Sequence, residues 1–424
     1  MSQTAGMNYK QCFTDAVVAA LMALVVFGPI MGVVLDGYKF DIDFQRVAVI
    51  VCVVFVGRFI MSYYFQTEKG KAMIFKYASN HDGVTVNPPH FKSKMIWVIP
   101  VVMVIGFLIP FIASKYILTV MILGLIYVLL GLGLNIVVGL AGLLDLGFVG
   151  FYAIGAYALA LGYENLGLGF WSMLPIAAIA AAFAGAILGF PVLRMHGDYL
   201  AIVTLGFGEI IRLVLTNWVS LTHGPNGISA PLPTFFGLEF KRRSASGETF
   251  HEFFNLPYDS GYKYMFIYLV LFAVVWAVLF IKHRLVKMPI GRAWEALRED
   301  EIACRSLGLN HVLVKLSAFM LGASTAGLAG VFFATYQGFV SPSSFTFFES
   351  ALILAIVVLG GMGSTLGVVI AAFCLTVLPE MLREVAEFRV LLFGILMVVM
   401  MIWKPRGLVR VTRNGFAARE GAVK

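Results

Sequence analysis

Long apolar runs constrain this chain more than any other feature of its sequence. The segment 117–193 contains only two charged residues, Asp145 and Glu164. A membrane-spanning helix needs roughly 17–25 mostly apolar residues, so this segment alone must contain several helices joined by tight turns. The strands of a transmembrane β-barrel alternate polar and apolar residues, which this segment does not do. The pattern therefore predicts an all-α fold, a polytopic bundle of transmembrane helices.

The composition excludes several classes of protein. Of the 424 residues, 60% are hydrophobic and 13% are charged, whereas a soluble domain has about 25% charged residues. This difference excludes a soluble enzyme, a disordered chain and a secreted disulfide scaffold. The four cysteines and seven histidines lack the spacing of a metal or redox site, and no phosphate-binding loop is present. We therefore expect no enzyme activity and no cofactor bound by this chain.

The apolar segments give a set of candidate spans. The tetrapeptide Gly360–Gly363 is predicted to make a tight turn between two of them. Since the last two segments are short, we expect about ten to twelve spans in total. In chain order, the candidate spans are 16–35, 47–65, 95–113, 117–138, 145–162, 172–193, 199–218, 264–281, 316–336, 343–360, 364–380 and 389–403.

The positive charge predicts the orientation of the spans. The net charge of +8 is concentrated in a few loops, which indicates membrane orientation and no nucleic-acid partner. Lysine and arginine are in excess in 66–94, 282–315 and 404–424, so these segments are expected in the cytoplasm. The acidic loop 36–46 is expected outside. The long loop 219–263 is balanced in charge, and the parity of the spans places it outside as well. Both termini are then cytoplasmic.

A change in composition near residue 90 predicts the domain organisation. Residues 1–90 are expected to form an N-terminal transmembrane hairpin of two helices, followed by a Lys-rich cytoplasmic loop. Residues 91–410 are denser in glycine and apolar residues and are expected to form the transmembrane core. Residues 411–424 are expected to be a basic cytoplasmic tail.

The segment 291–308 is predicted to be a short surface helix between two spans. It consists mostly of strong helix formers and carries seven charges beside Trp294 and Leu297. A solvated loop helix and a docking helix for a cytoplasmic partner both fit this pattern. The two large apolar residues favour docking, because water alone would not favour them there. The candidate contact residues are Arg292, Trp294, Glu295, Leu297, Arg298, Glu299, Asp300 and Gly308.

Four polar residues are candidates for a pathway or a buried polar network. Asn135 and Asp145 lie in the glycine-rich stretch 131–155, which indicates either close helix packing or a polar cavity. Glu209 and Arg212 are three residues apart, so they share one helix face and can pair. Such a pair inside a span either joins structural elements or contacts the substrate.

Five motifs follow one another in the chain: 197–212, 222–227, 291–308, 338–342 and 359–364. Taken in order, they resemble one family, the LivM-type permease subunits of branched-chain amino-acid ABC importers. The resemblance covers about 95–410, and the N-terminal hairpin resembles the extension found in Gram-negative members. The segment 291–308 then corresponds to the coupling loop, although Leu297 after Glu295-Ala296 departs from the common Glu-Ala-Ala pattern.

The resemblance implies import of leucine, isoleucine or valine across the bacterial inner membrane. It implies a second permease subunit, two cytoplasmic ABC ATPases that use the ATP, a periplasmic binding protein and the surrounding membrane lipid. In that arrangement 219–263 is a periplasmic loop and 282–315 is the cytoplasmic coupling loop.

Two alternative functions stay open. A sister ABC permease for urea or short amides shares the family signature. An ion-coupled secondary transporter is an alternative of another class, and it needs carboxylates within the membrane to hold the coupling ion. Asp145 and Glu209 are the candidates for that role.

Overall fold

The computed structural model describes residues 106–192, 198–235, 249–253 and 259–381, together with short pieces elsewhere in the chain. The chain divides into two compact units. One unit consists of 1–96 with 414–424, and the other consists of 97–413. The predicted domain boundaries at residues 90 and 410 stay predictions.

The described part of the first unit includes a β-hairpin. Strand β1 (Val33–Asp36) pairs in antiparallel register with β2 (Lys39–Ile42). The prediction of a helix from 16 to 35 is therefore wrong at its end, because the adjacent β-branched valines that begin β1 favour an extended chain. Most of that predicted span, and most of the span 47–65, lie outside the described residues.

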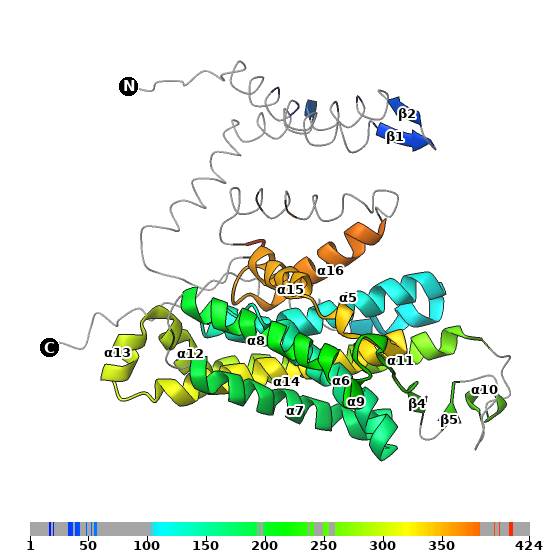
Figure 1. Ribbon diagram of the computed structural model, residues 1–424. Coiled ribbons are helices and arrows are strands. Elements are labelled where there is room, and N and C mark those ends of the chain that lie inside the picture. Colours follow the sequence, from blue (N-terminus) through cyan, green and yellow to red (C-terminus); the bar gives the residue numbers. More distant parts are fainter. Residues whose placement is uncertain are drawn as a thin grey trace, which may run out of the picture. The chain divides into compact units, whose positions relative to one another are not determined.

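The described part of the second unit is almost entirely helical, which confirms the all-α fold (Figure 1). Its short helices are α9 (Val219–Thr222), α10 (Phe250–Phe253), α12 (Pro289–Glu299) and α13 (Glu301–Ser306), and a π-helix covers Asn135–Leu140. Its two-residue strands are β3 (Ile228–Ser229), β4 (Thr234–Phe235), β5 (Leu238–Glu239) and β6 (Phe339–Val340). Its long helices are α5 (Lys115–Leu134), α6 (Phe148–Leu166), α7 (Phe170–Val192), α8 (Asp198–Asn217), α11 (Gly261–Lys287), α14 (His311–Gln337), α15 (Phe347–Gly360) and α16 (Thr365–Met381).

Six helical segments among the described residues are long and apolar enough to cross a membrane, so the chain is a multi-pass membrane protein. Each coincides with a predicted span. Two further predicted spans, 145–162 and 364–380, are also helical, as α6 and α16. The span 389–403 and much of 95–113 lie outside the described residues, and the total of ten to twelve stays a prediction. The six segments are Lys115–Leu140, Phe170–Phe190, Tyr199–Asn217, Gly261–Lys287, His311–Gln337 and Pro342–Gly360.

Helix α14 lies at the centre of the second unit and packs against α5, α6 and α7. Small residues allow these helices to approach closely. A Cβ atom on Gly155 of α6 would collide with the backbone of Gly327 on α14, and one on Gly330 would collide with the carbonyl of Tyr152. Such contacts are typical of helix packing in membranes, where close van der Waals approach replaces the hydrophobic effect.

The two ends of the bundle carry different connections. Strand β3 pairs with β6, so the loop that follows α8 lies beside the C-terminal end of α14. The helices α12 and α13 directly precede the N-terminal end of α14 and lie at the opposite end (Figure 1). Since α14 has 27 residues, these ends are about 40 Å apart, close to the thickness of a bilayer with its headgroups. Which end faces the cytoplasm stays a prediction.

Candidate functional site

The predicted surface helix 291–308 is two helices in the structure. Helix α12 ends at Glu299, and α13 begins at Glu301. Between them Asp300 is extended, and its carboxylate accepts the N–H groups of Ile302 at 2.8 Å and Ala303 at 3.0 Å. This N-cap satisfies two backbone donors that a helix start leaves unpaired, so it separates the helices. The prediction of one continuous helix is therefore wrong.

The largest apolar residue of this segment faces its own chain. Trp294 is 0% exposed, and its indole N–H donates to the carbonyl of Val314 at 3.1 Å and to the hydroxyl of Ser317 at 3.0 Å. Leu297 is buried as well. Both residues therefore hold α12 against the rest of the bundle. Because they are buried, they do not fit the prediction that they contact a partner directly. The other candidate contact residues, Glu295 among them, are half-buried or exposed.

Two polar contacts hold the α12–α13 segment to the bundle. The guanidinium of Arg298 donates to the carbonyl of Gly139 in the π-helix. The ammonium of Lys315 on α14 pairs with the carboxylate of Glu301 at 2.8 Å, and Lys315 is only 2% exposed. This pair was not predicted from the sequence, although a lone lysine at the start of an apolar helix is a signal for a buried partner.

An apolar surface of α13 and the start of α14 faces away from the bundle. Ile302 is 76% exposed, Leu307 is 82% exposed and Leu313 is 60% exposed. Arg292, Glu299, Asp300 and Gly308 of the same segment are exposed as well. Exposed apolar residues with a polar rim are typical of a protein interface. The residues predicted from the sequence as apolar contacts, Trp294 and Leu297, are the buried ones, and these exposed residues were not predicted.

Asn135 joins α5 to the turn between α15 and α16. Its side-chain amide donates to the carbonyl of Ser364 at 3.2 Å and accepts the N–H of Gly363 at 2.7 Å. The residue is fully buried. A Cβ on Gly139 would collide with this amide and with Gly363, so only glycine fits there. Asn135 thus belongs to a buried polar network and not to an exposed surface.

Asp145 links the start of α6 to α8. One carboxylate oxygen, Oδ1, accepts the N–H of Gly147 at 2.9 Å, while the hydroxyl of Thr204 on α8 accepts the N–H of Leu146 at 3.0 Å. Asp145 is fully buried, and its Oδ2 atom has no hydrogen-bond partner within the described ranges. Like Asn135, it is part of a buried network. Thr204 was not predicted, since a lone threonine in an apolar helix carries no signal.

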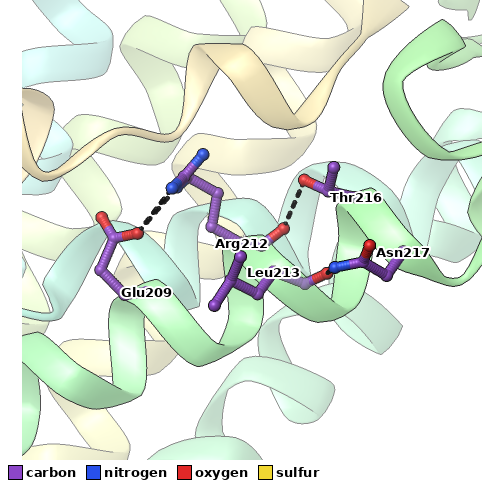
Figure 2. A network of polar contacts seen from close by, with 5 residues as sticks. All are labelled: Glu209, Arg212, Leu213, Thr216 and Asn217. Carbon is purple, nitrogen blue, oxygen red and sulfur yellow. Dashed lines mark hydrogen bonds and ion pairs between the residues drawn. The ribbon is translucent and has the colours of Figure 1, made fainter.

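Glu209 and Arg212 differ from these two residues because they reach the surface of the unit. The guanidinium contacts Oε2 of Glu209 through Nε at 2.9 Å and through Nη2 at 2.8 Å. Their side chains are 33% and 34% exposed. Figure 2 shows the pair on α8, followed along the helix by Thr216 and Asn217, which donate to the carbonyls of Arg212 and Leu213. The predicted pairing is present.

Glu349, at the start of α15, contacts α5. Its carboxylate accepts the hydroxyl of Tyr127 at 2.6 Å, and the residue is half-buried. Among the described residues, no group of three or more His, Cys, Asp or Glu side chains could hold a metal ion. The polar residues described above thus join helices to one another. Two surfaces stay partly exposed: the apolar surface of α13 and the start of α14, and the Glu209–Arg212 pair on α8.

Comparison with known proteins gives matches over nearly the whole chain. A family model described as "Branched-chain amino acid transport system / permease component" matches residues 116–403, and a model of a domain of unknown function matches 11–109. The chain is 50% identical over 420 residues to the high-affinity branched-chain amino acid transport system permease protein LivM of Escherichia coli (strain K12). That alignment covers 96% of this chain and 97% of the relative. LivM of Salmonella typhimurium is 49% identical with the same coverage.

A more distant likeness extends to another permease of the same transport system. The permease protein LivH of Escherichia coli (strain K12) is 25% identical over 312 residues, which cover 68% of this chain and 92% of LivH. No solved structure matches the chain.

Proposed function

Since the chain belongs to the family of branched-chain amino acid transport permeases, we propose that it provides half of the membrane pathway of an ATP-driven importer of leucine, isoleucine and valine. The family is one of transport permease components and not of enzymes. The identity of 50% over almost the full length of both chains supports the substrate class. The membrane is the bacterial inner membrane, with both termini in the cytoplasm.

The importer is an assembly of several proteins. A second permease subunit completes the pathway, and the likeness of this chain to LivH supports a partner of related fold. Two cytoplasmic ABC ATPases supply the energy, and a periplasmic binding protein delivers the amino acid. The chain binds no cofactor itself, because the ATPases use the ATP.

The two-sided α12–α13 segment is the observation that carries the mechanism. Its exposed side, with Ile302 and Leu307, contacts an ATPase. Its inner side is attached to α14 through Trp294 and to the π-helix through Arg298. The π-helix is attached in turn to the α15–α16 turn through Asn135. When the ATPases close, the displacement of α12 and α13 therefore reaches α14 and the α15–α16 turn as a rigid-body movement, which alternates access to the pathway.

Uptake by intact cells tests the substrate class. A bacterial strain without its own branched-chain importer receives this chain with its partner subunits. We expect labelled leucine uptake that unlabelled isoleucine and valine inhibit and that urea does not. A strain that expresses the partners without this chain is the control. Uptake of urea or a short amide, with no uptake of leucine, would assign the chain to the sister permeases.

A further inference from the structure

Helix α8 presents a charged strip where a membrane helix would be expected to be apolar. Its inner face is buried and consists of Ala201, Thr204, Gly208 and Leu215. Its outer face carries Ile202, Ile210 and Leu213, which are exposed. Glu209, Arg212 and Thr216 are spaced three and four residues apart, so they form one strip at the border of these faces.

Hydrocarbon does not tolerate such a strip. Ionisable groups within membrane spans are costly and nearly always face protein or a water-filled cavity. The pair is about one third exposed, so this exposed part needs a cover that the described residues of the unit do not provide. Helix α8 also contacts α15 and the short 3-10 helix Pro342–Ser344 that precedes it. Figure 2 shows the two side chains extending from α8 side by side.

The chemistry of the pair specifies what fits against it. The contact uses Nε and Nη2 of Arg212 and Oε2 of Glu209. The Nη1 group of Arg212 and the Oε1 atom of Glu209 take no part in it. A guanidinium binds carboxylates well through parallel N–H groups, and a carboxylate oxygen accepts N–H groups of an ammonium. A positive and a negative group therefore lie side by side, which is the complement of a zwitterion.

The surroundings of the pair specify the rest of the ligand. Leu213 follows Arg212 directly and lies beside it in Figure 2, and both Leu213 and Ile210 are exposed. An aliphatic side chain on the ligand would bury apolar surface against them. A neutral amide such as urea can hydrogen-bond to the same two atoms, but it carries no charges to complement them. An anion would meet the Glu209 carboxylate.

We propose that the Glu209–Arg212 pair lines the translocation pathway and binds the ammonium and carboxylate groups of the passing amino acid, with Leu213 against its side chain. This inference rests on the proposed function and names the residues that recognise the substrate class. A role in which the pair only joins α8 to the second permease subunit is the alternative outcome of the test.

Substrate uptake by reconstituted complexes tests the proposal. The variants Glu209→Gln and Arg212→Gln should assemble with their partners and retain ATPase activity stimulated by the binding protein, while leucine uptake falls at least about tenfold. The double variant Glu209→Arg/Arg212→Glu restores the ion pair with its polarity reversed. It should transport as poorly as the single variants, because the ammonium and carboxylate of the amino acid then each meet a group of like charge. Asn217→Ala, on the same helix, is the matched control and should transport normally.

Accessibility to water gives a second measurement that is independent of activity. In a complex whose chain lacks its native cysteines, Leu213→Cys should react with a small hydrophilic thiol reagent, and saturating leucine with the binding protein should slow this reaction. Leu215→Cys, on the buried face of α8, should not react. Full uptake by the charge-reversed variant, or no reaction at Leu213→Cys, would overturn the proposal.

If the unsubstituted complex transports urea and not leucine, the proposed function fails instead, and the two failures are distinguishable.

Discussion

Replacing Leu307 by aspartate should detach the ATPases without weakening the fold of the permease. Leu307 is 82% exposed, so the change removes almost no internal contact and should alter the free energy of unfolding by no more than about 0.5 kcal/mol. If Leu307 is an anchor of the ATPase interface, its loss costs about 2 kcal/mol of binding free energy. Since 1.4 kcal/mol corresponds to a tenfold change, the ATPase should bind roughly 30-fold more weakly.

Trp294→Ala is the contrasting variant on the inner side of the same segment. Trp294 is fully buried, and truncation of such a residue costs about 3–5 kcal/mol of folding free energy. Its two hydrogen bonds, to Val314 and Ser317, are also lost. Trp294→Phe keeps an aromatic ring but removes the N–H donor and part of the indole volume, so it should cost more than about 1 kcal/mol and less than Trp294→Ala.

Two measurements on the purified complex separate these effects. The ratio of ATPase to permease after affinity purification reports docking, and the thermal unfolding midpoint of the permease reports stability. Leu307→Asp should lower only the ratio, whereas Trp294→Ala should lower both. A normal ratio for Leu307→Asp would refute the assignment of the exposed side of α13 to the ATPase. A normal midpoint for Trp294→Ala would refute the packing argument.

Three further predictions concern the interior of the bundle. Lys315→Met should destabilise the permease by about 3 kcal/mol because it removes one partner of the buried Lys315–Glu301 ion pair, and the double variant Lys315→Met/Glu301→Leu should recover most of that loss in a thermal unfolding assay. Gly327→Val should lower the yield of monodisperse protein in size-exclusion chromatography, because its side chain collides with α7 and the helices must separate; an unchanged elution profile would contradict the packing. Asp145→Asn should assemble and transport normally, since an amide oxygen can still accept the Gly147 N–H, whereas Asp145→Ala should lose about 1–3 kcal/mol of stability. Impaired uptake by a stable Asp145→Asn variant would show that the carboxylate has a role beyond this buried link.

The sequence predicted the helices well because their signal is local. A run of apolar residues long enough to span a membrane has few other structures available to it. Helices α5, α7, α8, α11, α14 and α15 all coincide with predicted spans. The end of the first predicted span was missed because the apolar residues there fit a strand as well as a helix.

The sequence identified the 291–308 segment but not its inner and outer sides. Gly291, Trp294 and Leu297 recur every three residues and are buried, which is the spacing of one helix face. Spacing does not specify whether that face packs on the same chain or on a partner. The break at Asp300 had a signal, since aspartate is a preferred N-cap residue, but the strong helix formers on both sides masked it.

The polar contacts of the site could not be predicted because they join residues far apart in the chain. Asn135 binds Ser364 across 229 residues, and Arg298 binds Gly139 across 159 residues. No local pattern contains such pairings. The Glu209–Arg212 pair differs from these contacts, because its spacing of three residues places both side chains on one helix face.

Leucine uptake into proteoliposomes is the most direct test that this chain is a permease of an ATP-driven amino-acid importer. The vesicles contain this chain, its second permease subunit and the ATPases, and the binding protein is added outside with labelled leucine. We expect uptake that requires both the binding protein and ATP enclosed in the vesicles, and that ionophores do not abolish. Uptake driven by a proton or sodium gradient without ATP would contradict it and would assign the chain to the ion-coupled transporters.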